Sequence, residues 1–480
     1  MVFSRADAIR RTVPRLASDT LWYSVAGVVG KALALLSVPF LTRALGPSDY
    51  GLVDLSTATA GLLAVVAMFA GDIPLSRLIA HAGSVDDRRR AYTEYIVAAS
   101  FLASVMAIVV MLSASFIASA VWSSPGSEAL VILSAALIPI SGVRSALATL
   151  HRLEGNSRRF ALLTTLDVGG QVAFAVAFVA LGFGAYGAVL GLIAGGSLAL
   201  VVTIATTHRL LATRFDARAA ADLIAKGVPF LPPLVAFVGA DYLARTFIAG
   251  SLGQAAVGEF GLALRIASVL ALMTAAFQLA WSPRAAAMIQ GAETTHIFGR
   301  TLLGYAISAG LVCIVLVSAA PEVVGLVSGS EFAGASVVLP ALAFAAVLAG
   351  THFILSMGSV VNGGSWMVAT SALSGAIVQV LVTAITIGAL GLWAAGLGAV
   401  VGRAVSVGLL APRVAPAFGR RMVSASVVLV AVAVVCLLIG LTATDPTGSR
   451  PLRVLVAVGA GVALAGFACT SLGWAEKNPS

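Results

Sequence analysis

Four basic residues stand inside long apolar segments of this chain, where a charge is costly to bury. They are Lys31, Arg245, Arg265 and Arg403. An ionisable group near the centre of a lipid bilayer costs about 2.5 to 3.5 kcal/mol on insertion scales, so it usually faces the protein interior or a water-filled cavity. Cations held away from bulk water attract phosphate groups strongly. The four residues therefore predict a site for an anionic, phosphate-bearing group.

Nearby acids leave a structural interpretation open for some of these cations. Asp241 lies four residues before Arg245, one helical turn away, so the two could neutralise each other. Glu259 lies six residues before Arg265, which is too far for the same helix face. Arg403 has no acidic neighbour in the sequence, and it could instead cap helix ends near the cytoplasm.

Lys31 and a polar pair in another apolar segment also have two interpretations. Lys31 has no acid within a helical turn, and it could line a cavity, snorkel to the interface or pair with a distant acid. Asp167 and Gln171 share a helix face, where they could line a cavity for sugar hydroxyls, carry a proton, or join helices by hydrogen bonds. Asp241, Glu259 and Asp167 are the candidates for coupling to an ion.

Other chemistry has little support in the sequence. The histidines show no metal-ligand spacing, and no outer loop holds paired carboxylates or a nucleophile beside a base. We therefore expect no catalytic residues, no metal and no cofactor. The cysteines are expected to be inert packing residues with no thiol pair: Cys313, Cys436 and Cys469.

Composition defines the environment of these residues. The chain of 480 residues is 60% hydrophobic and only 10% charged, with a mean hydropathy of +1.04, which excludes a water-soluble protein. Its net charge of +9 comes from short basic clusters beside apolar runs. A nucleic-acid-binding surface would need a long basic stripe, so the charge is better read as a topology signal, and no nucleic-acid partner is expected.

Apolar runs of helical length predict an all-α, polytopic membrane protein, since about 20 apolar residues span a bilayer core. We expect 14 transmembrane helices, at about 20–44, 50–70, 92–121, 128–150, 160–182, 185–206, 228–250, 256–281, 301–327, 335–361, 366–389, 391–412, 421–442 and 452–473.

Lysine and arginine fix the expected orientation. Of the 29 Lys and Arg residues, 22 fall in alternate gaps, Arg144 among them, and such residues are retained in the cytoplasm. We therefore expect both termini in the cytoplasm and a multi-pass protein of the inner, cytoplasmic membrane. The tryptophans lie near predicted helix ends, as interfacial indoles do.

A faint internal repeat predicts two halves. Leu181–Gly187 resembles Leu390–Gly396 at an offset of 209 residues, and Tyr50–Leu52 resembles Phe260–Leu262 at a similar one. An even helix number in each half makes the repeat parallel, which favours two six-helix lobes around a central cavity. The expected parts are an N-lobe (1–206), a cytoplasmic linker (207–226), a C-lobe (227–413) and two additional C-terminal helices (414–480).

The segment Leu41–Gly51 resembles the signature of polysaccharide-lipid flippases in the multidrug/oligosaccharidyl-lipid/polysaccharide exporter superfamily. Asp241–Arg245 and Val257–Ala263 resemble the matching region of helices 7 and 8. The resemblance implies export of undecaprenyl-pyrophosphate-linked oligosaccharides by alternating access, with cavity cations binding the headgroup. The implied products are surface polysaccharides such as lipopolysaccharide O-antigen or exopolysaccharide. The implied partners are this lipid-linked substrate, membrane lipids, and polysaccharide polymerase and assembly proteins.

Four alternatives stay open. A multidrug or cation antiporter of the same superfamily would be expected to place acids in its cavity, whereas the central charges here are mainly basic. A flippase for a lipid-linked peptidoglycan precursor would use the same diphosphate chemistry. An enzyme of the same pathway would need a large outer loop, but the longest outer gap is about ten residues. A non-transporting scaffold would tolerate loss of the buried cations.

Overall fold

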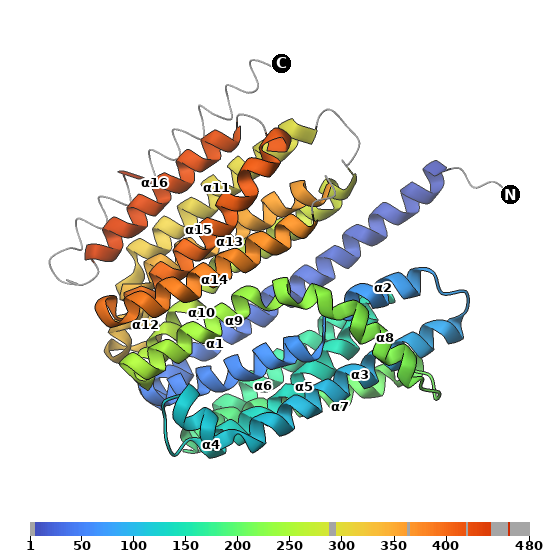
Figure 1. The fold of residues 1–480 in the computed structure, drawn as a ribbon, viewed down its shortest axis with the longest axis horizontal. Helices are drawn as coiled ribbons and strands as arrows, with labels where there is room; N and C mark the ends of the chain where they lie inside the picture. Colours follow the sequence, from blue (N-terminus) through green and yellow to red (C-terminus); the bar gives the residue numbers. More distant parts are fainter. Residues whose placement is uncertain (1–4, 288–293, 362–364, 419–420, 443–458, 461–480) are drawn as a thin grey trace. The chain divides into compact units, whose positions relative to one another are not determined.

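The chain folds into a set of long helices, as the apolar runs predict (Figure 1). This computed structural model describes residues 5–287, 294–361, 365–418, 421–442 and 459–460, and it contains no strand within those ranges. Its α-helices are α1 (Arg5–Ala67), α2 (Asp72–Ala80), α3 (Val85–Leu112), α4 (Ala114–Phe116), α5 (Glu128–Leu153), α6 (Ser157–Ala180), α7 (Gly184–Thr207), α8 (Ala217–Gly227), α9 (Leu231–Leu252), α10 (Gln254–Ala287), α11 (Thr294–Ser318), α12 (Ala320–Ser328), α13 (Ala333–Val361), α14 (Ser365–Leu390), α15 (Trp393–Phe418) and α16 (Arg421–Thr442).

Twelve segments of the described residues are long and apolar enough to cross a membrane. The first of them, Gly27–Ala80, contains most of the first two predicted helices, because α1 continues through the expected gap and is interrupted only at Gly46 (φ 68°, ψ 173°). A positive φ of this kind suits glycine, which has no Cβ to clash. The predicted helix at 452–473 lies outside the described residues, apart from 459–460.

Two compact units make up the chain. Unit 1 comprises residues 1–45 and 52–235, and unit 2 comprises residues 46–51 and 236–480. In unit 1, aromatic and aliphatic side chains of α2, α3, α5 and α8 form a buried core that includes Leu75, Tyr92, Tyr95, Leu147 and Leu223. The predicted lobe boundaries stay a prediction, but the predicted linker 207–226 carries a real helix, α8, which packs on this core.

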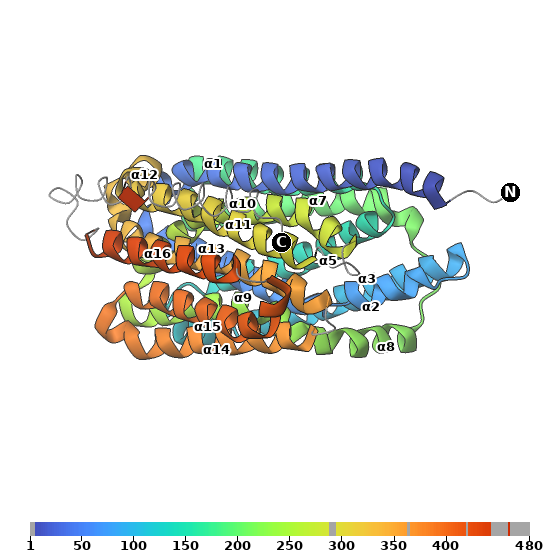
Figure 2. The same cartoon turned by 90° about the horizontal axis from the view of Figure 1, so that it is seen from above.

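Small residues allow close helix pairs in both units. In unit 1, a Cβ built on Gly191 or Gly195 of α7 would lie 2.3 Å from a backbone nitrogen of α6, so these glycines form a packing surface between the two helices. In unit 2, a Cβ on Gly402 of α15 would lie 2.5 Å from the carbonyl oxygen of Gly375 on α14. The α14 and α15 helices run side by side in both views (Figure 1 and Figure 2).

Candidate functional site

A polar cluster inside unit 2 joins three helices. The carboxylate of Asp241 on α9 accepts a hydrogen bond from Gln379 Nε2 on α14 at 2.7 Å. Its other oxygen lies 3.9 Å from Arg403 Nη2 on α15, and the two side chains are 30% and 21% exposed. Gln379 is 1% exposed, and its Oε1 accepts no hydrogen bond within the described part of the chain. The amide oxygen of Gln379 is therefore a buried hydrogen-bond acceptor for a ligand hydroxyl, in the same cluster as the guanidinium of Arg403.

This cluster changes the expected partner of Asp241 and gives Arg403 a partner that the sequence did not show. Its neighbour one turn away, Arg245, donates to the backbone carbonyl of Asp241 at 2.9 Å, while the carboxylate meets Gln379 and Arg403. Arg403, which has no acid near it in sequence, therefore has one in space. Helix packing across more than 130 residues of chain brings these groups together, and helical spacing cannot show that.

Each arginine predicted in unit 2 lies over an aromatic ring. The guanidinium carbon is 3.7 Å from the ring centroid for Arg403 over Phe237, 5.5 Å for Arg245 over Phe260, and 5.1 Å for Arg265 over Tyr50. A ring covers one face of the guanidinium plane, whereas the N–H donors lie in the plane. This arrangement stabilises a cation in an apolar environment and suits it to bind phosphate at its edge.

The ring beneath Arg265 belongs to the segment Leu41–Gly51 that resembles the flippase signature. Tyr50 is 1% exposed and meets Phe332 edge-on at 5.7 Å. A Cβ on Gly51 would lie 2.1 Å from the carbonyl oxygen of Gln254, and a Cβ on Gly258 would lie 2.1 Å from that of Pro47. Residues 46–51 of the first stretch and residues 254–258 are thus packed directly against each other within unit 2.

This reciprocal contact involves two pairs of positions 207 residues apart, Gly51 with Gly258 and Pro47 with Gln254, close to the offset of the predicted repeat. Gly46 and Gly253, which open the two stretches, both have positive φ, 68° and 87°. At the other end of the repeat, Gly182 and Gly391 also share positive φ, which agrees with the predicted offset of 209.

Glu259, proposed from the sequence as a coupling residue, stabilises a helix start. Its Oε1 accepts a hydrogen bond from the backbone N–H of Gly334 at 3.1 Å, in the first turn of α13. A carboxylate there satisfies an N–H that has no partner within the helix and complements the positive end of the helix dipole. A Cβ on Gly334 would lie 2.2 Å from Glu259 Oε2, so a side chain there would displace the carboxylate from this position.

In unit 1, Asp167 and Gln171 do share a face of α6, as predicted, and Gln171 Nε2 donates to Asp167 Oδ1 at 2.7 Å. The unforeseen member of this cluster is Arg144. The sequence analysis counted it with the cytoplasmic cations, but it lies within α5, 14% exposed, with Nε 3.0 Å from Asp167 Oδ2. The expectation was wrong because a buried carboxylate lets an arginine stay inside an apolar helix.

Lys31 is half-buried on α1, and no carboxylate forms an ion pair with it in the part of unit 1 that the structure describes. Lys31 belongs to unit 1 and the three arginines to unit 2. Their predicted convergence on one central cavity therefore stays a prediction.

The cysteines differ from expectation as well. Cys313 on α11 and Cys436 on α16 are buried, and their sulfur atoms lie 3.7 Å apart. The sequence analysis foresaw no thiol pair, because 123 residues separate them. Cys469 lies outside the described residues.

Among the groups that sequence reasoning missed, Gln379 had a usable signal. It is a lone amide in an otherwise apolar segment, and such a residue usually has a partner inside a bundle. Phe237, Tyr50 and Phe260 gave none, since an aromatic residue in an apolar helix is ordinarily a packing residue.

The fold is that of a many-helix, all-α membrane protein whose apolar helices carry arginines. The structure is similar to that of the lipid II flippase MurJ in an inward closed conformation, with a TM-score of 0.73 and 12% identity over 94% of this chain and 99% of that one. It is also similar to an inward-facing multidrug resistance MATE family transporter of the MOP superfamily (TM-score 0.60, 16% identity, 88% and 99% covered). A mutant of the Vibrio cholerae MATE transporter VcmN matches as well (TM-score 0.59, 14% identity, 84% and 95% covered).

The sequence itself identifies the family. Residues 16–289 match the polysaccharide biosynthesis protein family, and the chain belongs to that family. A sequence search of curated proteins finds no match. The protein is therefore a polytopic membrane protein of the polysaccharide biosynthesis family, with a fold similar to those of the lipid II flippase and the MATE transporters.

Proposed function

We propose that this protein flips undecaprenyl-diphosphate-linked oligosaccharide repeat units across the inner membrane for surface polysaccharide export. The observation that carries the proposal is that Arg245, Arg265 and Arg403 each lie over an aromatic ring inside unit 2. The cargo headgroup combines a diphosphate with sugar hydroxyls. The N–H edge of a guanidinium group suits the diphosphate, and a buried amide acceptor such as Gln379 Oε1 suits a sugar hydroxyl.

The proposed mechanism is alternating access. The headgroup passes through a cationic interior to which Lys31 also contributes, while the prenyl tail stays in lipid, so only the polar part of the cargo is shielded. Both termini are proposed to lie in the cytoplasm, with loading from the cytoplasmic leaflet. Asp241 and Asp167 then act mainly by holding Arg403 and Arg144 in place.

Transport of cationic drugs has less support. A drug-binding cavity would need accessible anionic groups. Of the three acids considered for coupling, Asp167 faces Arg144 at 3.0 Å and Asp241 faces Arg403 at 3.9 Å, which offsets their negative charge. The third, Glu259, accepts a hydrogen bond from the backbone of Gly334. A lipid-linked peptidoglycan precursor carries the same diphosphate as a lipid-linked oligosaccharide. The complementation experiment below distinguishes these two cargoes.

The test is complementation of surface-glycan export in cells that lack this protein. Lys31→Ala, Arg245→Ala and Arg265→Ala are expected to lower export at least about tenfold at equal membrane abundance, as loss of a charged hydrogen-bond donor costs about 1.5 to 3 kcal/mol. Charge-conserving Lys31→Arg, Arg245→Lys and Arg265→Lys should retain part of it.

The matched control is Arg413→Ala, which removes an exposed arginine from α15. It should leave export near the level of the unsubstituted protein. Unimpaired export by well-expressed Arg245→Ala and Arg265→Ala would contradict the proposal. Rescue of cells depleted of their lipid II flippase, without surface-glycan export, would reassign the cargo to the peptidoglycan precursor.

A further inference from the structure

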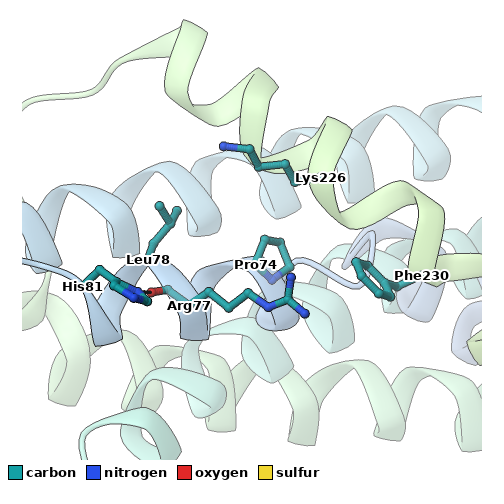
Figure 3. Close-up of a pocket in the computed structure, with 6 residues that line it drawn as sticks. All are labelled: Pro74, Arg77, Leu78, His81, Lys226 and Phe230. Atoms are coloured by element: carbon teal, nitrogen blue, oxygen red, sulfur yellow. Dashed lines mark hydrogen bonds between the residues drawn. The ribbon is translucent and has the colours of Figure 1, made fainter. Parts of the chain in front are cut away.

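Unit 1 has a pocket of about 460 Å³ that none of the preceding residues line (Figure 3). It lies between α2 and the C-terminal end of α8, together with the short turn that precedes α9. Its walls combine three basic side chains with three apolar ones: Arg77, His81 and Lys226 with Pro74, Leu78 and Phe230.

The walls of this pocket are firmly anchored. On α8, Ala220 and Leu223 are buried in the same core as Leu75 of α2. At the end of α8, a Cβ on Gly227 would lie 2.3 Å from the carbonyl oxygen of Phe69, so the two backbones are in direct contact. The side chains of α2 and α8 that face the pocket therefore project from elements that are fixed relative to each other.

The basic groups are available to an anion. Arg77 is exposed, lies 6.0 Å over the Phe230 ring, and forms no ion pair with any residue that the structure describes. His81 Nδ1 lies 2.8 Å from the carbonyl oxygen of Arg77, so it must be the donor, which leaves Nε2 for a ligand. Lys226 pairs with Asp222, but both side chains are more than half exposed, and such a pair is weak.

The apolar side chains give the site an amphipathic character. Leu78 is 42% exposed and Phe230 38%, beside the cations. The pocket also lies where membrane-spanning segments end, since α2 closes the apolar segment Gly27–Ala80 and α8 opens the segment Ala217–Leu252. Lipid headgroups occupy that level of a bilayer, and basic residues beside aromatic ones are typical of it.

We propose that this pocket binds the phosphate headgroup of a resident anionic phospholipid, of the phosphatidylglycerol class. Arg77 and Lys226 contact the phosphate, His81 Nε2 contributes a further polar contact, and the upper acyl chain lies on Leu78 and Phe230. An open site with one ion-paired cation suits a ligand that the membrane supplies at high concentration. The inference does not depend on which cargo the protein carries.

The experiment is native mass spectrometry of the full-length protein, titrated with phosphatidylglycerol or with zwitterionic phosphatidylcholine. The first phosphatidylglycerol should bind at least about tenfold more tightly than phosphatidylcholine. Arg77→Gln/Lys226→Gln should abolish most of that preference, since each basic residue near an anionic lipid contributes about fivefold and the two together about 25-fold. Arg77→Lys should retain most of it.

The control is Arg209→Gln/Arg218→Gln, which removes two exposed arginines of unit 1 that do not line the pocket. The substituted side chains are exposed, and unchanged melting temperatures verify that the variants fold. An unchanged preference in Arg77→Gln/Lys226→Gln, or an equal loss in the control, would overturn the proposal. Displacement of bound phosphatidylglycerol by equimolar undecaprenyl diphosphate would assign the pocket to a diphosphate lipid instead, whereas retention supports the resident phospholipid.

Discussion

An arginine inside an apolar helix must replace the water that it has lost, and this protein does so in three ways. Arg144 has a buried carboxylate at 3.0 Å, Arg403 has a carboxylate at 3.9 Å and a ring at 3.7 Å, and Arg265 lies over the ring of Tyr50. A close carboxylate neutralises the guanidinium, whereas a ring stabilises its charge without cancelling it. The chemistry of a buried arginine thus depends on its partners, and Arg403 has both kinds.

Arg144 and Asp167 provide a prediction about stability. Arg144→Met should lower the free energy of unfolding by about 3 kcal/mol, because it leaves a buried carboxylate without its cation. The double variant Arg144→Met/Asp167→Asn should recover most of that loss. Thermal unfolding in detergent measures both. A double variant less stable than the single one would show that the pair itself, rather than the stranded charge, provides the stability.

Sequence alone predicted the buried cations but not their partners. Lys31, Arg245, Arg265 and Arg403 are visible as charges in apolar runs, whereas Arg144 looked cytoplasmic because it lies near the end of its run. Asp241 and Arg403 are 162 residues apart, and only the packing of α9 against α14 and α15 brings them together. A helical-spacing rule compares residues within a turn, so it cannot find such pairs.

At the scale of elements, glycines determine how closely helices approach. Gly51 and Gly258 form a reciprocal contact in which each Cβ position lies 2.1 Å from a carbonyl oxygen of the other stretch. Apolar periodicity predicted most helix bounds within a few residues, but it missed that α1 continues past Gly46 and that the predicted helix 301–327 is divided into α11 and α12. A hydropathy profile reports only which residues avoid water, so a helix break at a single glycine does not change the profile.

The glycine contact predicts a sharp size limit. Gly51→Ala and Gly258→Ala should each lower stability by about 1–3 kcal/mol, because an added methyl group would force the backbones apart. Gly239→Ala and Gly61→Ala are matched controls, since a Cβ at either position would meet nothing within 4 Å. Melting temperature and membrane abundance measure the effect. Equal behaviour of the test and control variants would contradict the close approach.

The packing of α11 against α16 is tested by its cysteines. Because the sulfur atoms of Cys313 and Cys436 lie 3.7 Å apart, copper–phenanthroline should oxidise them to a disulfide, which needs an S–S distance of about 2.05 Å. Proteolysis between the two helices, followed by non-reducing electrophoresis, would then leave the fragments joined. Fragments that separate despite complete loss of free thiols would contradict this arrangement, and Cys313→Ser provides the control.

At the scale of the whole molecule, length and hydropathy were enough to predict an all-α, polytopic membrane protein, because few other structures satisfy backbone groups in lipid. The family match and the similarity to solved transporters agree with that class. The identity of the cargo is harder to predict from the sequence than the fold class. Sugar recognition depends on dispersed polar groups such as Gln379, and their role follows from three-dimensional placement.

The most direct test of the central claim is transport by the purified protein in proteoliposomes. A labelled undecaprenyl-diphosphate oligosaccharide should cross the bilayer much faster with the unsubstituted protein than in empty liposomes. Arg265→Ala should fall close to the empty-liposome rate, whereas Arg413→Ala should not. The contradictory result would be equal rates for the unsubstituted protein and Arg265→Ala, or movement of a cationic drug without movement of the diphosphate lipid.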